Sequence, residues 1–82
     1  MNFQQLEYAL AVHRTKHFGK AAESCNITQA TLSAMIKKLE EELSVQLFDR
    51  SRHPIQTTDD GILVLKKAED ILAKQQELFH LS

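Results

Sequence analysis

The sequence predicts a mainly helical fold, in which a core of three helices carries a two-stranded hairpin and one long helix follows. Apolar residues recur at helical spacing over residues 2–13 and again over 28–43. Two short, partly alternating segments come next. A final stretch from about residue 59 to residue 79 then repeats apolar residues every seven positions. With 82 residues the chain supports one small domain, and burial against a partner subunit would help its small core.

The first two helices are expected to be short. The apolar stripe of residues 2–13 ends near the polar run 14–17, which predicts the end of the first helix. A second helix over residues 18–24 contains two adjacent alanines, which let another helix approach closely. Asn26 lies in the turn that follows and tolerates the left-handed backbone common at a helix C-terminus.

The third helix is expected to begin after Thr28 and to run to about Leu43. The Thr28 hydroxyl can accept a hydrogen bond from a free amide of the first turn, so this residue is the predicted N-cap. The first turns of the helix carry small polar side chains, and its apolar residues fall on one stripe. A helix of this kind buries one side and offers its first turns to an outside partner. In a helix-turn-helix that partner is the major groove of DNA.

A hairpin and a long helix complete the chain. Residues 47–50 and 54–57 are predicted strands joined by residues 51–53, which together would form a wing. Thr58 is the predicted N-cap of the last helix, and two aspartates in its first turn suit the helix dipole. The last helix is expected to end near residue 79.

We therefore expect a winged helix-turn-helix DNA-binding domain over residues 1–58 and a linker helix, which dimerises, over residues 59–82. The second half of the last helix projects past the domain, with no partner left in the chain. The residues expected at the dimer interface are Leu65, Ala68, Leu72, Leu78 and Phe79.

The overall charge excludes a protein that binds DNA through bulk charge alone, because ten basic residues face eleven acidic ones and the net charge is −1. Between residues 14 and 52, however, basic side chains outnumber acidic ones, and three of the acids cluster at 40–42. We interpret that cluster as a solvated helix end. No apolar run approaches the roughly 20 residues of a membrane span, and no signal peptide is evident, so a cytoplasmic location is expected.

Neither catalysis nor a cofactor is expected. The four histidines show no metal-ligand spacing, and a single cysteine cannot form an internal disulfide. Cys25 is expected to be a small buried residue without a redox role. With two glycines, no phosphate loop and no cysteine–histidine constellation, the sequence does not predict an enzyme.

The polar residues of the third helix and the wing have both a binding and a structural interpretation. Gln29 can bond bidentately to adenine, while Lys37 would reach the DNA backbone. Arg52 and His53 at the hairpin tip can enter a minor groove or hold a phosphate. Alternatively, the serines and threonines only cap the helix, and the hairpin tip is a solvated loop.

These residues also resemble a known family, through linked motifs that cover about residues 1–80. The chain is similar to the N-terminal domain of LysR-type transcriptional regulators, which are bacterial proteins. The motifs that carry the resemblance are Phe18-x-x-Ala21-Ala22, Thr28-Gln29-x-x-Leu32-Ser33-x-x-Ile36-x-x-Leu39-Glu40-x-x-Leu43-x-x-x-Leu47-Phe48-x-Arg50 and Thr57-Thr58-x-x-Gly61. Residues 18–33 look somewhat like the peroxide-sensing branch of that family.

The resemblance implies sequence-specific binding of double-stranded DNA by a homodimer on an inverted repeat, with a tetramer in the full-length protein. It also implies a C-terminal effector-binding domain that is absent here, so a small-molecule or redox effector would act only through that missing domain. The residues at the family's DNA-binding positions are Thr28, Gln29, Ala30, Thr31, Ser33, Ala34 and Lys37 in the recognition helix, and Arg50, Arg52 and His53 in the wing.

Two departures from the family pattern keep a second function open. The family usually has proline where Ala30 stands and often arginine where Ala34 stands. Loss of that arginine removes a strong contact and shifts weight to Gln29, Thr31 and Lys37. The alternative is a helical protein-interaction or dimerisation module, in which the last helix is the main surface and DNA binding is weak or vestigial.

Overall fold

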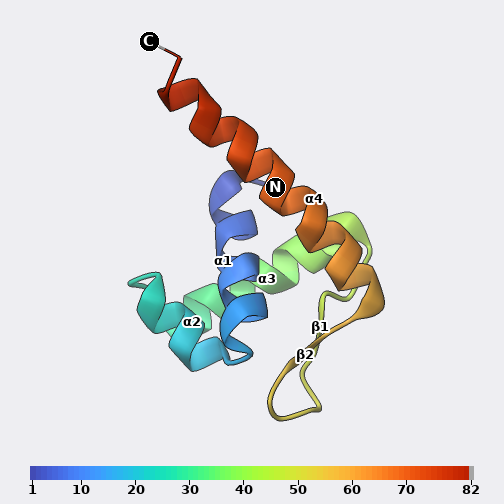
Figure 1. Ribbon diagram of the computed structural model, residues 1–82. Helices are drawn as coiled ribbons and strands as arrows, with labels where there is room; N and C mark the ends of the chain where they lie inside the picture. Colours follow the sequence, from blue (N-terminus) through green and yellow to red (C-terminus); the bar gives the residue numbers. More distant parts are fainter. Residues whose placement is uncertain (82) are drawn as a thin grey trace.

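Each helix of the structure begins at a side chain that accepts a hydrogen bond from a free amide of the first turn. The computed structural model describes residues 1–81. The four capping residues are Asn2, His17, Thr28 and Thr58. In chain order, the elements are α1 (Phe3–Thr15), α2 (Phe18–Ser24), α3 (Gln29–Leu43), β1 (Phe48–Asp49), β2 (Gln56–Thr57) and α4 (Asp59–Phe79), as Figure 1 shows.

The helices also end in a regular way. Lys16 after α1, Asn26 after α2 and Ser44 after α3 have positive φ angles of 57°, 57° and 55°. Left-handed residues of this kind let the chain turn away while the last carbonyls stay bonded. The predicted role of Asn26 is confirmed. Helix α1 runs two residues further than residues 2–13 suggest, because the polar residues Arg14 and Thr15 continue the helix to the left-handed Lys16.

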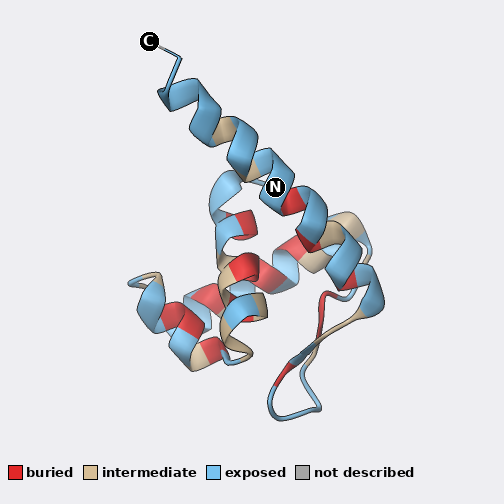
Figure 2. Cartoon of the chain, in the orientation of Figure 1, coloured by how far each residue is buried: buried red, intermediate tan, exposed pale blue. Residues whose placement is uncertain are grey.

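The core lies between α1, α2, α3, the wing and the first half of α4. Figure 2 shows the buried residues on the faces that these elements turn toward one another. The fully buried side chains with the largest volumes are Phe48, Leu32, Ile36, Leu39, Leu47, Leu65 and Val12. The predicted winged helix-turn-helix fold with a long last helix is confirmed.

The wing is shorter than predicted. Its antiparallel strands contain two residues each, with Phe48 opposite Thr57 and Asp49 opposite Gln56. The ladder stops there because the backbone amides beside it bind elsewhere. Leu47 N–H donates to a carboxylate of α3 (2.7 Å), and Ile55 N–H donates to a carbonyl at the end of α1 (3.2 Å). The wing is thus attached to two helices through its own backbone.

Helix α4 has two different halves. Its first half packs on α1, and Leu65 and Ala68 are only 1% exposed. The sequence prediction that placed these two residues at a dimer interface is therefore wrong, because their surface is already used inside the chain. The second half extends away from the wing and α2 (Figure 1) and is mostly exposed. Within residues 1–81, no helix is long and apolar enough to cross a membrane.

Candidate nucleic-acid interface

The start of α3 is held by a compact cap. Thr28 Oγ1 accepts the Thr31 N–H at 3.1 Å and donates to Thr31 Oγ1 at 2.8 Å. The cap that the sequence predicts at Thr28 is thus present. The Thr31 hydroxyl accepts the hydrogen bond that the Thr28 hydroxyl donates. Both threonines therefore have a structural role in the cap that does not require an outside partner.

Beyond the cap, four predicted contact residues form one exposed face. Gln29, Ala30, Ala34 and Lys37 are all exposed, and at about 100° per residue they fall within an arc of about 140° around α3. Thr31 is exposed as well and lies about 60° beyond Ala34 around the helix. The outward face of α3 therefore has a long polar side chain near each end and two alanines between them.

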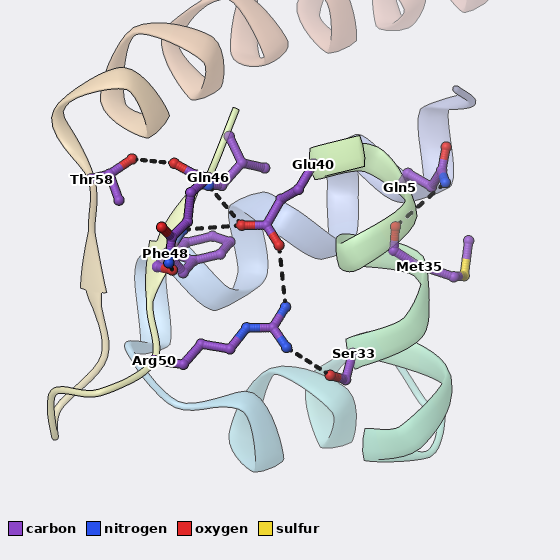
Figure 3. Close-up of polar contacts among 9 residues, drawn as sticks. Gln5, Ser33, Met35, Glu40, Gln46, Phe48, Arg50 and Thr58 are labelled. Atoms are coloured by element: carbon purple, nitrogen blue, oxygen red, sulfur yellow. Dashed lines mark hydrogen bonds and ion pairs between the residues drawn. The ribbon is translucent and has the colours of Figure 1, made fainter. Parts of the chain in front are cut away.

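Ser33 and Arg50, both predicted to meet DNA, bind each other in the structure. Arg50 Nη1 donates to Ser33 Oγ at 3.1 Å, and Ser33 is half-buried. The second nitrogen, Nη2, lies 3.4 Å from a carboxylate oxygen of Glu40. Figure 3 shows the guanidinium between these two residues of α3. Arg50 therefore connects the wing to α3.

Glu40 is the centre of this junction. Its Oε2 accepts hydrogen bonds from the amides of Leu47 (2.7 Å) and Phe48 (3.4 Å), while Oε1 faces Arg50 (Figure 3). The interpretation of residues 40–42 as a solvated acidic end is wrong for this residue. Its side chain is only 15% exposed, whereas Glu41 and Glu42 are exposed. Acid near a helix C-terminus is unfavourable for the helix dipole, but here it satisfies buried amides.

Aromatic packing completes the junction. The Arg50 guanidinium carbon lies 4.7 Å from the centre of the Phe18 ring, a cation–π distance. Phe18 in turn meets Phe48 edge to face, with ring centres 6.1 Å apart. The wing, α2 and α3 are thus fixed to one another around Arg50.

The wing tip, in contrast, is exposed. Arg52 and His53 both face solvent, and Arg52 Nε lies 3.5 Å from Asp49 Oδ2. Hydrogen bonds from the side chain and backbone of Ser51 hold the pKa of Asp49 below its usual value, and the Arg52 charge adds to the effect. A charged Asp49 keeps the turn of the wing in shape and leaves Arg52 and His53 outside it.

A polar cluster ties the end of α1 to the wing. His13 Nδ1 lies 2.6 Å from Thr57 Oγ1, and Lys16 Nζ lies 3.2 Å from both atoms. Since Lys16 donates to Thr57 Oγ1, the threonine hydroxyl can donate to an unprotonated His13 Nδ1. Burial, and next the Lys16 charge, lower the pKa of His13. These contacts favour the neutral imidazole.

The structure also describes the remaining candidates for chemistry. Within residues 1–81, no three histidine, cysteine or acidic side chains are arranged to hold a metal ion. Cys25 was expected to be buried but is only half-buried, and its Sγ lies 3.8 Å from Ser24 Oγ.

Sequence reasoning missed several residues that position this surface. Two of them, Glu40 and Phe18, contact partners that are distant in sequence, which a local pattern cannot show. The third, His17, caps α2 with its imidazole, and the local pattern gives no clear signal for such a cap. The Asn2–Gln5 capping box was detectable from its spacing.

The chain matches the family model described as bacterial regulatory helix-turn-helix protein, lysR family, over residues 3–62. The chain belongs to the LysR family. It is 43% identical over 72 residues to a hydrogen peroxide-inducible genes activator of Haemophilus influenzae, covering 88% of this chain and 24% of the relative. It is 40% identical over 78 residues to the DNA-binding transcriptional dual regulator OxyR of Escherichia coli K12, covering 95% of this chain and 26% of the relative.

Solved structures give the same assignment. A crystal structure of a complex between the BenM DBD and catB site 1 DNA superposes with a TM-score of 0.95 at 34% identity, covering 99% of this chain and 87% of that one. The predicted LysR family is confirmed, and the peroxide-responsive relatives agree with the predicted branch. The chain spans about a quarter of the length of the curated relatives it matches.

Proposed function

We propose that this chain is the sequence-specific DNA-binding domain of a bacterial LysR-type transcriptional regulator. The observation that carries the proposal is the exposed face at the start of α3, which lies beside an exposed wing tip on a scaffold that matches a DNA-bound relative. A major groove accepts an α-helix, and a wing beside it contacts the flanking backbone or minor groove.

The exposed face of α3 determines what can be read. Gln29 has the amide that pairs bidentately with adenine, and Lys37 carries a charge for the backbone. Ala30 and Ala34 have only methyl groups, so the helix can approach closely and contact the methyl group of thymine. We therefore propose an A·T-rich half-site, with Arg52 and His53 on the flank.

The domain would act as a dimer on an inverted repeat, because two identical reading helices require two related half-sites. Four large apolar side chains support this part of the proposal: Phe3 (48% exposed), Ile71 (40%), Leu78 (70%) and Phe79 (71%). Phe3, Ile71 and Leu78 line the same groove between α1 and the far half of α4. With half-buried Leu72, these residues replace Leu65 and Ala68 in the proposed interface.

The same apolar surface favours the second candidate function, a protein-interaction module with weak DNA binding. The two functions are separated by whether the protein selects a DNA sequence. The test is selection of duplexes from a random pool at moderate salt, followed by fluorescence anisotropy with the selected duplex and a scrambled one. We expect enrichment of an inverted repeat and at least about a thousandfold preference over the scrambled duplex. Equal affinity for both duplexes would leave the interaction module as the better account.

Dimerisation has its own experiment, with a matched control on α4. Ile62 and Ile71 have similar exposure, 48% and 40%, but nine positions place them on opposite faces of the helix. We expect Ile71→Lys to lower the dimer mass to that of a monomer in sedimentation equilibrium and Ile62→Lys to leave it unchanged. A parent protein that stays monomeric at all concentrations would refute the dimer.

A further inference from the structure

A groove of about 480 Å³ lies beside the first residue of α3. Its walls come from three parts of the chain: the turn into α2, the first residue of α3 and the wing tip. The residues that matter to its chemistry are Lys16, His17, Gly19, Lys20, Gln29 and His53. Two lysines and two histidines line it, and no acidic side chain does.

The two lysines differ in availability. Lys16 already donates to Thr57 and contacts His13. Lys20 is exposed, and among residues 1–81 it has no ion pair within 4 Å. The nearest acid in sequence, Glu23, lies one turn further along α2 and does not line this groove. Lys20 is therefore a free cation at the edge of the groove.

His17 provides a second donor without needing a charge. Its Nδ1 accepts the backbone N–H of Lys20 at 3.0 Å, because it caps α2. A neutral imidazole that accepts at Nδ1 carries its proton on Nε2. The ring is exposed, so this N–H is available to an acceptor in the groove.

Gly19 brings this donor next to the reading residue. A Cβ at position 19 would lie 2.9 Å from Cε1 of His17 and 3.4 Å from Oε1 of Gln29. Without that atom, the imidazole and the Gln29 amide both approach the same stretch of backbone. Whatever occupies the groove therefore lies beside the side chain proposed to read a base.

We propose that this groove holds one phosphate group of the DNA backbone, adjacent to the base read by Gln29. Lys20 supplies the charge, His17 donates a hydrogen bond, and His53 closes the opposite wall from the wing. A phosphodiester fits because it offers only acceptors and a negative charge to a site lined by donors. By fixing the backbone there, the groove sets the depth at which Gln29 enters the major groove. This inference rests on the proposed function.

The experiment uses the duplex selected from the pool and a set of its variants, each with one neutral methylphosphonate in place of a phosphate. We expect one position per half-site to weaken binding of the parent protein about tenfold, and to have no effect on the Lys20→Gln protein. Lys20→Gln should also reduce the slope of log affinity against log salt by about one, or about two for a dimer that uses both grooves. Lys66→Gln, an exposed lysine of α4, is the matched control and should behave as the parent.

The two ideas fail differently. If the parent protein selects no duplex, both the proposed DNA-binding function and the proposed phosphate site are refuted. If the parent binds its selected duplex but Lys20→Gln and Lys66→Gln give the same salt slopes and methylphosphonate profiles, only the groove is refuted. Both variants change exposed side chains, and an unchanged helical circular dichroism spectrum would confirm that they fold.

Discussion

The two ends of α3 are built in opposite ways. At the start of the helix, the side chains of Gln29, Ala30 and Ala34 are exposed to solvent. At the other end, Leu39 is fully buried and Glu40 bonds to two backbone amides and to Arg50. One helix therefore contains a surface free to meet a partner and an anchor that fixes the surface in space. Binding and stability can thus be changed separately along the 15 residues of α3.

The largest effect should come from removing the anchor. Glu40→Ala leaves the amide of Leu47, and the more distant amide of Phe48, without an acceptor in a buried region, and it removes the ion pair with Arg50. We expect the free energy of unfolding to fall by about 2–3 kcal/mol, as measured by urea denaturation. The control is Glu41→Ala at the exposed next position, with an expected change within about 0.5 kcal/mol. Equal losses in the two variants would contradict the anchoring role.

The second effect tests the free end. Gln29→Ala should weaken binding to the selected duplex by about 1–3 kcal/mol and relax the preference at one base pair, because it removes one bidentate contact. Its free energy of unfolding should stay within about 0.5 kcal/mol of the parent. Anisotropy titrations against duplexes that vary that base pair measure the change. If affinity falls equally for every duplex, Gln29 does not read a base.

The third effect concerns the N-cap of α3, Thr28, which contributes to stability at the exposed end of the helix. Thr28→Ala removes the acceptor for the Thr31 amide and should lower the free energy of unfolding by about 1 kcal/mol. Thr28→Ser keeps a hydroxyl and should retain most of the stability. Thermal or urea unfolding of the parent and the two variants measures these changes. If the Ala variant is as stable as the Ser variant, the Thr28 hydroxyl does not stabilise the start of α3.

The smallest effect concerns pH and the tie between α1 and the wing. The folded pKa of His13 lies below its ordinary value of 6.5, so the unfolded chain binds a proton more readily than the folded one. The His13 contribution to stability is therefore present above about pH 6.5 and is lost as pH falls through the folded pKa. We expect His13→Gln to flatten this part of the stability curve, measured by urea denaturation between pH 5 and pH 8. An unchanged curve would mean that another group is responsible.

Much of the fold was predictable because its signals are local. The caps at Thr28 and Thr58, the left-handed Asn26 and the bounds of α3 follow from neighbouring residues and helical spacing. Likewise, the exposed predicted contacts of α3 and the wing tip could be placed from the sequence.

The rest depends on contacts between distant segments. The sequence pattern does not show that Arg50 turns back to Ser33 across 17 residues, or that Glu40 binds the amides of the wing. Leu65 and Ala68 share a heptad pattern with Leu72, and spacing alone cannot say which partner a stripe faces when two are available. Tertiary packing buries Leu65 and Ala68 in the chain's own core, and this packing is not visible in the sequence.

The angle at which α4 leaves the domain is fixed near its first turn. A Cβ at Gly61 would overlap the carbonyl oxygen of Leu47, so only glycine lets the helix rest directly on the backbone just before β1. From Gly61 to Phe79 the helix continues for about 27 Å. A tilt of about 10° at Gly61 would move the far end by about 5 Å. In a dimer joined at the far ends of two such helices, the distance between the paired half-sites would depend on the packing at Gly61, about 27 Å from the joined ends.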